Sequence, residues 1–152
     1  MGNLYTPLVY LDNCMFNRPF DEQGNIRIRL ETEAKLYIQA MIKNKELSLV
    51  WSYILDYEND KNPFFERKFA IEQWLDLSTI IIEQCPEIIE YAQRLVEQNI
   101  KIKDALHVAC TVQAKAHYFL STDDKLLKKL AYNTDIRALN PINFIQELAD
   151  DY

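Results

Sequence analysis

The stretch Leu8-Val9-Tyr10-Leu11-Asp12-Asn13 is a short apolar run that ends abruptly in a carboxylate. Such a run favours a strand buried on both faces, as in a parallel sheet. Its last residue then brings an acid to the carboxyl-terminal edge of the sheet, where open α/β sheets bind ligands. The stretch predicts a central strand that carries a functional acid, Asp12. The alternative for Asp12 is a turn residue that hydrogen-bonds its own backbone.

Strands and helices alternate along the rest of the chain. Strands are expected at 8–11, 47–52, 118–121 and 136–139, and helices at 26–43, 53–58, 64–74, 85–98, 103–115, 125–130 and 140–149. We expect 13–25 to be a polar, turn-rich segment, and 78–82 to be either a short extended piece or a connector. Short strands separated by helices indicate parallel pairing, so the expected fold is a three-layer α/β/α sandwich with a central parallel sheet.

Composition limits the class of protein. The 152 residues suggest one domain, 1–152, with 49% hydrophobic and 26% charged residues, which is ordinary for a globular protein. The net charge of −6 argues against a protein that coats nucleic acid, which would be basic. It does not exclude an enzyme that acts on nucleic acid, because acids gathered around a divalent cation also lower the pI. Gly2 and Gly24 stand too far apart for a phosphate-binding loop or a nucleophile elbow.

The expected compartment is the cytoplasm. No apolar run approaches the ~20 residues that span a membrane, and the first residues do not resemble a secretory signal. The three cysteines, Cys14, Cys85 and Cys110, are odd in number, widely spaced and without a C-x-x-C pair. This pattern favours reduced thiols that pack as small buried hydrophobes.

Three further acids are expected at the same edge of the sheet as Asp12. Asp123 follows the strand at 118–121, Asp104 opens the helix at 103–115, and Glu58 lies about one and a half turns into the helix after the second strand. Four carboxylates in one cavity would repel each other and could not all stay ionised without a cation. Oxygen ligands without Cys or His suit Mg²⁺ or Mn²⁺, and such an ion activates water for attack on a phosphodiester.

Each of these acids has a structural alternative. Asp104 could cap a helix or stabilise its dipole. Asp123 could be the N-cap of the next helix, and Asp124 competes with it for either role. Glu58 could belong to a solvated face that includes its acidic neighbours. A packed helix histidine is favoured over a general base for His107, and Arg18 fits a phosphate contact or a loop anchor equally well.

Four pieces of the chain together resemble the PIN-domain (PilT N-terminal) family, in particular the VapC-like toxins. They are Val9-Tyr10-Leu11-Asp12, Ser52 with Glu58 six residues later, Ile102-Lys103-Asp104-Ala105-Leu106-His107-Val108-Ala109, and Phe119-Leu120-Ser121-Thr122-Asp123. The Lys-Asp-Ala-Leu-His block followed by a strand and Thr-Asp is the most specific of them. The chain departs from the family at Asn13 and Cys14, where Thr or Ser and a small polar residue are common.

The resemblance implies a flavodoxin-like α/β/α sandwich and a metal-dependent endoribonuclease, the toxin of a toxin–antitoxin pair. It implies Asp12, Glu58, Asp104 and Asp123 as the acidic set for Mg²⁺ or Mn²⁺. It further implies an RNA substrate, an antitoxin protein that plugs the site, and a homodimer. The alternative is a PIN-fold module that is catalytically weak or inactive and binds protein or RNA; the acidic pI and Cys14 favour it.

Overall fold

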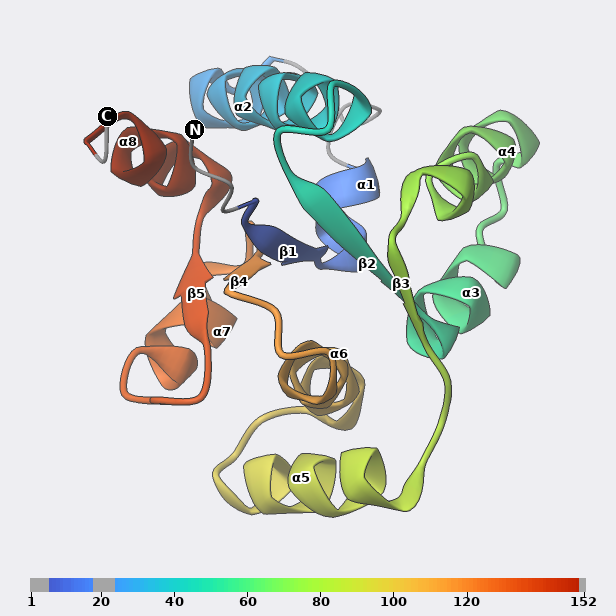
Figure 1. Cartoon of the computed structure of the whole chain (residues 1–152), viewed down its shortest axis with the longest axis vertical. Coiled ribbons are helices and arrows are strands. Elements are labelled where there is room, and N and C mark those ends of the chain that lie inside the picture. Colours follow the sequence, from blue (N-terminus) through green and yellow to red (C-terminus); the bar gives the residue numbers. More distant parts are fainter. Residues whose placement is uncertain (1–5, 18–23, 151–152) are drawn as a thin grey trace.

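A five-stranded parallel sheet forms the centre of the molecule (Figure 1). The computed structural model describes residues 6–17 and 24–150, so Arg18 lies outside the described residues. The strands are β1 (Leu8–Leu11), β2 (Ser48–Ser52), β3 (Ile80–Ile82), β4 (Tyr118–Leu120) and β5 (Arg137–Leu139). They are arranged in the order β3-β2-β1-β4-β5, and every pair is parallel. The expected parallel sheet is confirmed, with β1 between β2 and β4.

Helices cover both faces of the sheet and complete the expected three-layer sandwich. In chain order they are α1 (Asn13–Asn17), α2 (Ile26–Lys43), α3 (Tyr53–Asp60), α4 (Phe65–Glu72), the 3₁₀ turn η2 (Leu75–Leu77), α5 (Pro86–Glu97), α6 (Ile102–Gln113), α7 (Asp124–Leu130) and α8 (Pro141–Asp150). Figure 1 shows α2 beside α8 on one side of the sheet, and α5 packed on α6 on the other. None of the helices in the described ranges is both long and apolar enough to cross a membrane.

One segment differs from expectation, and the structure decides between the two alternatives for another. The segment after Asp12 begins with the short helix α1 rather than a turn, because Met15 and Phe16 are buried and pull it against the core. The N–H of Met15 donates to the Asp12 carbonyl at 2.8 Å, which starts the helix directly after β1. Residues 80–82 form the edge strand β3, paired with β2, rather than a connector.

Local sequence accounts for several helix ends. Pro86 and Pro141 each open a helix, where the missing N–H of proline costs nothing. Asn140 precedes α8 and its side-chain oxygen accepts from the N–H of Ile142 at 2.8 Å, as an N-cap does. Ser52 caps α3 in the same way, accepting from the N–H of Leu55 at 3.2 Å. The start of α3 is thereby fixed at the end of β2.

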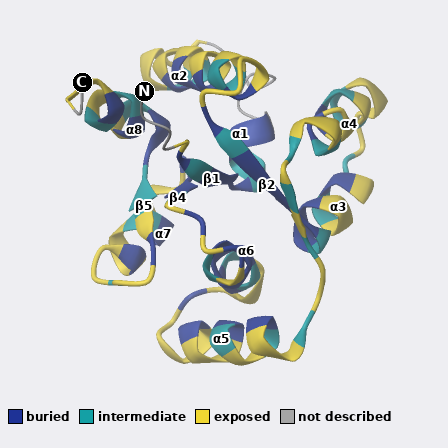
Figure 2. Cartoon of the chain, in the orientation of Figure 1, coloured by how far each residue is buried: buried dark blue, intermediate teal, exposed yellow. Residues whose placement is uncertain are grey.

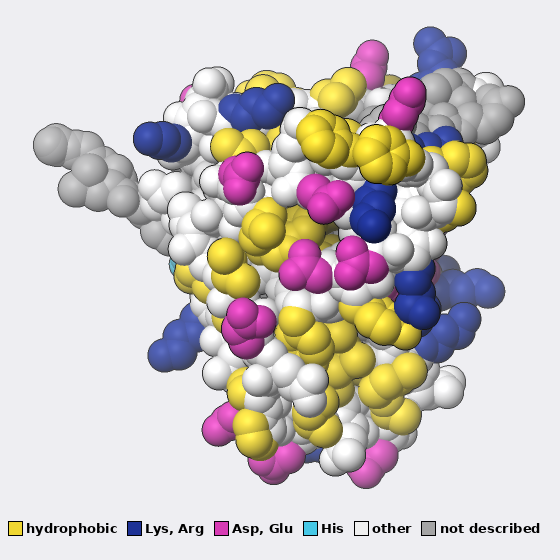
Figure 3. All heavy atoms as spheres, turned by 90° about the vertical axis from the view of Figure 1, so that its right-hand side faces the viewer, with side chains coloured by type: hydrophobic (Ala, Val, Ile, Leu, Met, Phe, Trp, Pro, Cys, Tyr) yellow, Lys and Arg dark blue, Asp and Glu magenta, His cyan; other side chains and the backbone are white. Residues whose placement is uncertain are grey.

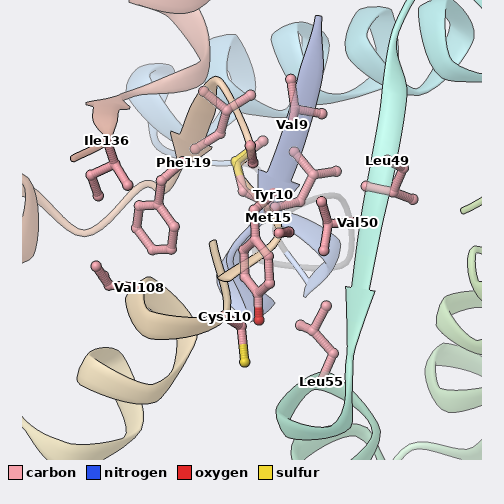
Figure 4. Close-up of a cluster of buried hydrophobic side chains, with 14 of the residues drawn as sticks. Val9, Tyr10, Met15, Leu49, Val50, Leu55, Val108, Cys110, Phe119 and Ile136 are labelled. Atoms are coloured by element: carbon pink, nitrogen blue, oxygen red, sulfur yellow. The ribbon is translucent and has the colours of Figure 1, made fainter. Parts of the chain in front are cut away.

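The core lies between the sheet and its helices. Figure 2 shows the buried residues of α2 and α5 on their inner sides and exposed residues on their outer sides. Tyr10 is buried at the centre of β1, and its ring stacks on Phe119 of β4 with the centroids 5.9 Å apart. In the close-up of Figure 4 the Tyr10 hydroxyl extends past the sheet toward Cys110 of α6 and Leu55 of α3. A polar group is therefore carried into the deepest part of the core.

One charged residue of α2 is also fully buried. The ammonium of Lys35 lies 4.5 Å from the ring centroid of Phe16 and 5.6 Å from that of Trp74, and within residues 6–17 and 24–150 no hydrogen-bond partner reaches it. Burial lowers the pKa of Lys35 from its usual value of 10.5 to about 7. A buried amine without a hydrogen bond destabilises the folded state.

Lys35→Met should therefore stabilise the protein, by roughly 1–4 kcal/mol at neutral pH, the gain seen when buried charges are replaced by apolar groups. Because the folded pKa is depressed, the unfolded chain binds the extra proton between pH 7 and about 10, so wild-type stability should rise with pH in that window. Urea unfolding at several pH values measures both effects. Lys43→Met is the matched control, since Lys43 is exposed although its ammonium also lies 5.5 Å from the Trp74 ring. An equal slope with pH in the wild type and Lys35→Met would contradict the expectation.

Candidate functional site

The carboxyl end of β1 is a topological switch point. The chain leaves β1 toward β2 on one side, and β4 occupies the other side. In open parallel sheets, ligands bind in the crevice that such a reversal leaves at the carboxyl ends of the strands. Asp12 directly follows β1, and Ser121 directly follows β4. The structure thus places the first predicted acid at the expected crevice.

The carboxylate of Asp12 is nearly buried and is held from both sides. Its Oδ1 accepts from the N–H of Asn13 at 2.8 Å, the local contact expected of a turn residue. Its Oδ2 accepts from the Ser121 hydroxyl at 2.8 Å, across the β1–β4 boundary. The Cys14 thiol also donates to Oδ2, at 3.5 Å. Asp12 is therefore fixed at the carboxyl end of β1 by the first residues of α1 and by the residue that follows β4.

Glu58 is tied to the core through a chain of buried polar groups. His107 of α6 is hydrogen-bonded through Nε2 to Oε1 of Glu58 and through Nδ1 to the Tyr10 hydroxyl, the latter at 2.6 Å. The Tyr10 hydroxyl is in turn 2.7 Å from Oγ of Ser52. Asp12 Oδ1 lies 3.8 Å from His107 Nε2. One imidazole thus stands between two of the four predicted acids.

The surroundings of His107 favour its protonated form. Burial acts to lower its pKa, but the hydrogen bond with Glu58 and the charges of Asp12, Glu58 and Asp104 outweigh burial, so the pKa is raised. His107 is a packed helix histidine, as expected, and it also contacts the acids directly. Glu58 is partly buried and engaged, so the solvated face proposed as its alternative is wrong.

Asp104 and Asp123 line the same small pocket of about 70 Å³, together with Lys101, Lys125 and Lys129. The pKa of Asp104 is raised by its burial and by the negative charges of Asp12, Asp123 and Glu58, while His107 acts in the opposite sense. Asp104 is thus close enough to each of the other three predicted acids to respond to its charge.

The structure gives Asp123 and Asp124 different contacts. Asp123 is the N-cap of α7, its Oδ1 accepting from the N–H of Leu126 at 3.2 Å, and it also faces the pocket of Asp104. Asp124 forms a two-point contact with the guanidinium of Arg27 on α2, at 2.5 and 2.6 Å. Asp124 is therefore engaged at the α2–α7 contact, and Asp123 remains the candidate fourth acid.

The donor chemistry of the cluster fits a hard divalent cation. No three Cys, His, Asp or Glu side chains within residues 6–17 and 24–150 are grouped closely enough to enclose a metal ion. The like charges that raise the pKa of Asp104 are nevertheless what a cation would offset. Cys14 does not compete as a ligand, because burial and the charge of Asp12 raise the pKa of its thiol to about 12. The remaining donors are carboxylate oxygens, which suit Mg²⁺ or Mn²⁺.

Comparison with known proteins identifies the fold. No family model matches the sequence, and no curated protein matches it significantly. Two solved structures are similar: a chain of VapBC2 from Rickettsia felis bound to a DNA fragment from its promoter, and a chain of DNA-bound VapBC from Salmonella typhimurium. The first has a TM-score of 0.56 and 14% identity, covering 88% of this chain and 98% of that one. The second has a TM-score of 0.54 and 13% identity, covering 90% of this chain and 99% of that one. The PIN-type fold implied by the sequence resemblance is confirmed.

Sequence reasoning missed three buried hydroxyls near the acids. Ser121 hydrogen-bonds Asp12, whereas Tyr10 bonds Ser52 and His107 rather than an acid. All three residues lie in or directly after strands that otherwise read as apolar. The signal that could have found them is the hydroxyl itself, since a polar tip on a fully buried strand must find a partner.

Tyr10→Phe should destabilise the fold by about 1–3 kcal/mol, because it leaves Ser52 and His107 without their shared buried partner. The free energy of unfolding in urea measures the loss. Tyr132→Phe is the matched control and should be neutral, since Tyr132 is 93% exposed. Equal stability of the two variants would show that the buried hydroxyl contributes nothing.

Cys14 should resist alkylation in the folded protein. A thiol whose pKa is about 12 holds almost no thiolate at pH 8, and the thiolate is the reactive form. Iodoacetamide at pH 8, followed by peptide mass spectrometry, should find Cys14 unmodified in the native protein and modified in urea. The same rate in both states would contradict the buried, protonated thiol.

Proposed function

We propose that the protein is a metal-dependent endoribonuclease of PIN type that acts as the toxin of a toxin–antitoxin pair. The observation that carries this proposal is that Asp12 and Asp123 follow the adjacent parallel strands β1 and β4, and that Asp104 responds to the charges of Asp12, Asp123 and Glu58. The structural likeness to VapBC chains supports it through the fold.

The residues have distinct roles in this proposal. Asp12, Asp104 and Asp123 would hold Mg²⁺ or Mn²⁺, which would supply Lewis-acid activation of water and charge stabilisation of the leaving oxygen. Oε1 of Glu58 is occupied by His107, so Oε2 is the atom that accepts a proton from water near the phosphodiester. Ser121 and the backbone of Asn13 keep the Asp12 carboxylate from turning away from the crevice. The lysines beside Asp104 and Asp123 suit the phosphates of RNA.

The proposal extends to partners and compartment. A small antitoxin protein would cover the acidic crevice, the active unit would be a homodimer, and the protein would work in the cytoplasm on cellular RNA. All three Cys residues are free thiols, as a reducing compartment requires.

Purified protein should cut single-stranded RNA in Mg²⁺ or Mn²⁺ and stop in EDTA. Asp12→Asn and Asp104→Asn should each lower kcat/KM by roughly 100-fold or more, the scale of groups that act in the transition state. Asp124→Asn is the matched control and should stay active, because Asp124 contacts Arg27 rather than the crevice. If Asp12→Asn folds and keeps full activity, the assignment of the acidic site is wrong.

A PIN-fold binding module without catalysis is the second candidate. The thiol of Cys14 beside Asp12, where the family commonly has a small polar residue, favours it. Thermal unfolding with and without millimolar Mg²⁺ or Mn²⁺ separates the two, because an ion that binds only the folded state raises Tm. No shift in Tm and no cleavage would favour the module.

A further inference from the structure

A cleft of about 330 Å³ adjoins the acidic site between α3 and α4. Asn13 and Glu58 line its end near the acids, and Phe64 and Arg67 line its far end. The volume lies within the ~300–1,000 Å³ of small-ligand sites. The cleft is continuous with the proposed catalytic residues, so its occupant would be part of the same substrate.

The far wall of the cleft combines an aromatic ring with a cation. Phe64 is 54% exposed, although it directly precedes α4 and is hydrophobic. The Arg67 guanidinium carbon lies 4.3 Å from the centroid of the Phe64 ring. Exposed aromatic rings and guanidinium planes are the groups on which proteins stack the bases of single-stranded RNA.

The floor of the cleft holds an unsatisfied hydrogen-bond acceptor. Asn59 is 2% exposed, and its Nδ2 donates to the carbonyl of Lys68 at 3.1 Å. Oδ1 of Asn59 is buried and has no hydrogen-bond partner among the described residues. A buried acceptor without a donor destabilises the folded protein, and a donor group on a ligand can remove that penalty.

The face around the cleft mixes apolar and basic groups within an acidic protein. Figure 3 shows hydrophobic side chains interspersed with basic and acidic ones on the side of the molecule where α3 and α4 lie. The ammonium of Lys61, at the end of α3, lies 4.7 Å from the centroid of the Tyr57 ring. Cations held against exposed rings complement a ligand that has both phosphate charge and flat bases.

We propose that this cleft binds one base of single-stranded RNA next to the scissile phosphate. The base stacks on Phe64, Arg67 contacts the adjoining phosphate, and the phosphodiester continues past Glu58 to the acidic cluster. This inference rests on the proposed RNA-cleaving function, whose site it extends by a substrate-binding position.

Binding of a short, unstructured RNA is measured with Ca²⁺ replacing Mg²⁺, and a denaturing gel establishes that the RNA is intact. Phe64→Ala should weaken binding roughly 10-fold, the scale of one lost base stack, while Phe64→Trp should keep it. Arg67→Ala should weaken binding and lower the salt slope by about 0.7, as expected for one phosphate contact on a single strand. In cleavage assays Phe64→Ala should raise KM and leave kcat nearly unchanged.

Phe65→Ala is the matched control, because Phe65 is the next residue, is 78% exposed and does not line the cleft. Equal binding by Phe64→Ala and Phe65→Ala, or tighter binding of double-stranded than of single-stranded RNA, would overturn the inference. If the wild type binds RNA through Phe64 but does not cut it with Mg²⁺ or Mn²⁺, the proposed catalysis fails and the base site stands. If it cuts RNA and Phe64→Ala leaves KM unchanged, the base site fails alone.

Discussion

The Asp12 carboxylate lies at the buried end of β1, where its charge must be stabilised by hydrogen bonds. The residues that supply these bonds determine the arrangement at the carboxyl end of the sheet. Asp12 is nearly buried, and without hydrogen bonds its charge would oppose folding strongly. The Ser121 hydroxyl meets this need from the neighbouring strand and thereby ties β1 to β4 at their ends. The same bond fixes the orientation of the Asp12 carboxylate, whose charge acts on Asp104, so one interaction serves both the fold and the candidate site.

The second organising feature is the buried chain from Ser52 through Tyr10 to His107 and Glu58. Its members come from two strands and two helices, and each hydrogen-bonds the next. Because Ser52 also caps α3, the position of Glu58 along that helix is fixed relative to the sheet. Like charges that would push Glu58 away from Asp12 are opposed by the imidazole between them.

The sequence was sufficient for four of the five strands, because they follow from local pattern, and it left 78–82 open. An apolar run ending in Asp12 identifies a buried strand and its carboxyl end without knowledge of the neighbours. The hydrogen bond of Ser121 and the burial of Lys35 depend on residues that are distant in the chain, and periodicity carries no information about them. Helix α1 was missed because its two buried residues pack against tertiary neighbours rather than forming a repeating face. The choice between Asp123 and Asp124 needed Arg27, which is nearly a hundred positions away and has no local link to either acid.

The strand order also determines which parts of the sheet and of the acidic site can form while the chain is being synthesised. β1 precedes the other four strands in the chain, yet one of its two edges pairs with β4, which follows β2 and β3. Until Tyr118–Leu120 has left the ribosome, β1 has one partner at most, and Asp12 lacks both Ser121 and Asp123. A nascent or truncated chain that ends before β4 therefore carries an open sheet edge and an incomplete acidic cluster. Assembly of the four acids is thus delayed until the segment that follows β4 has been synthesised.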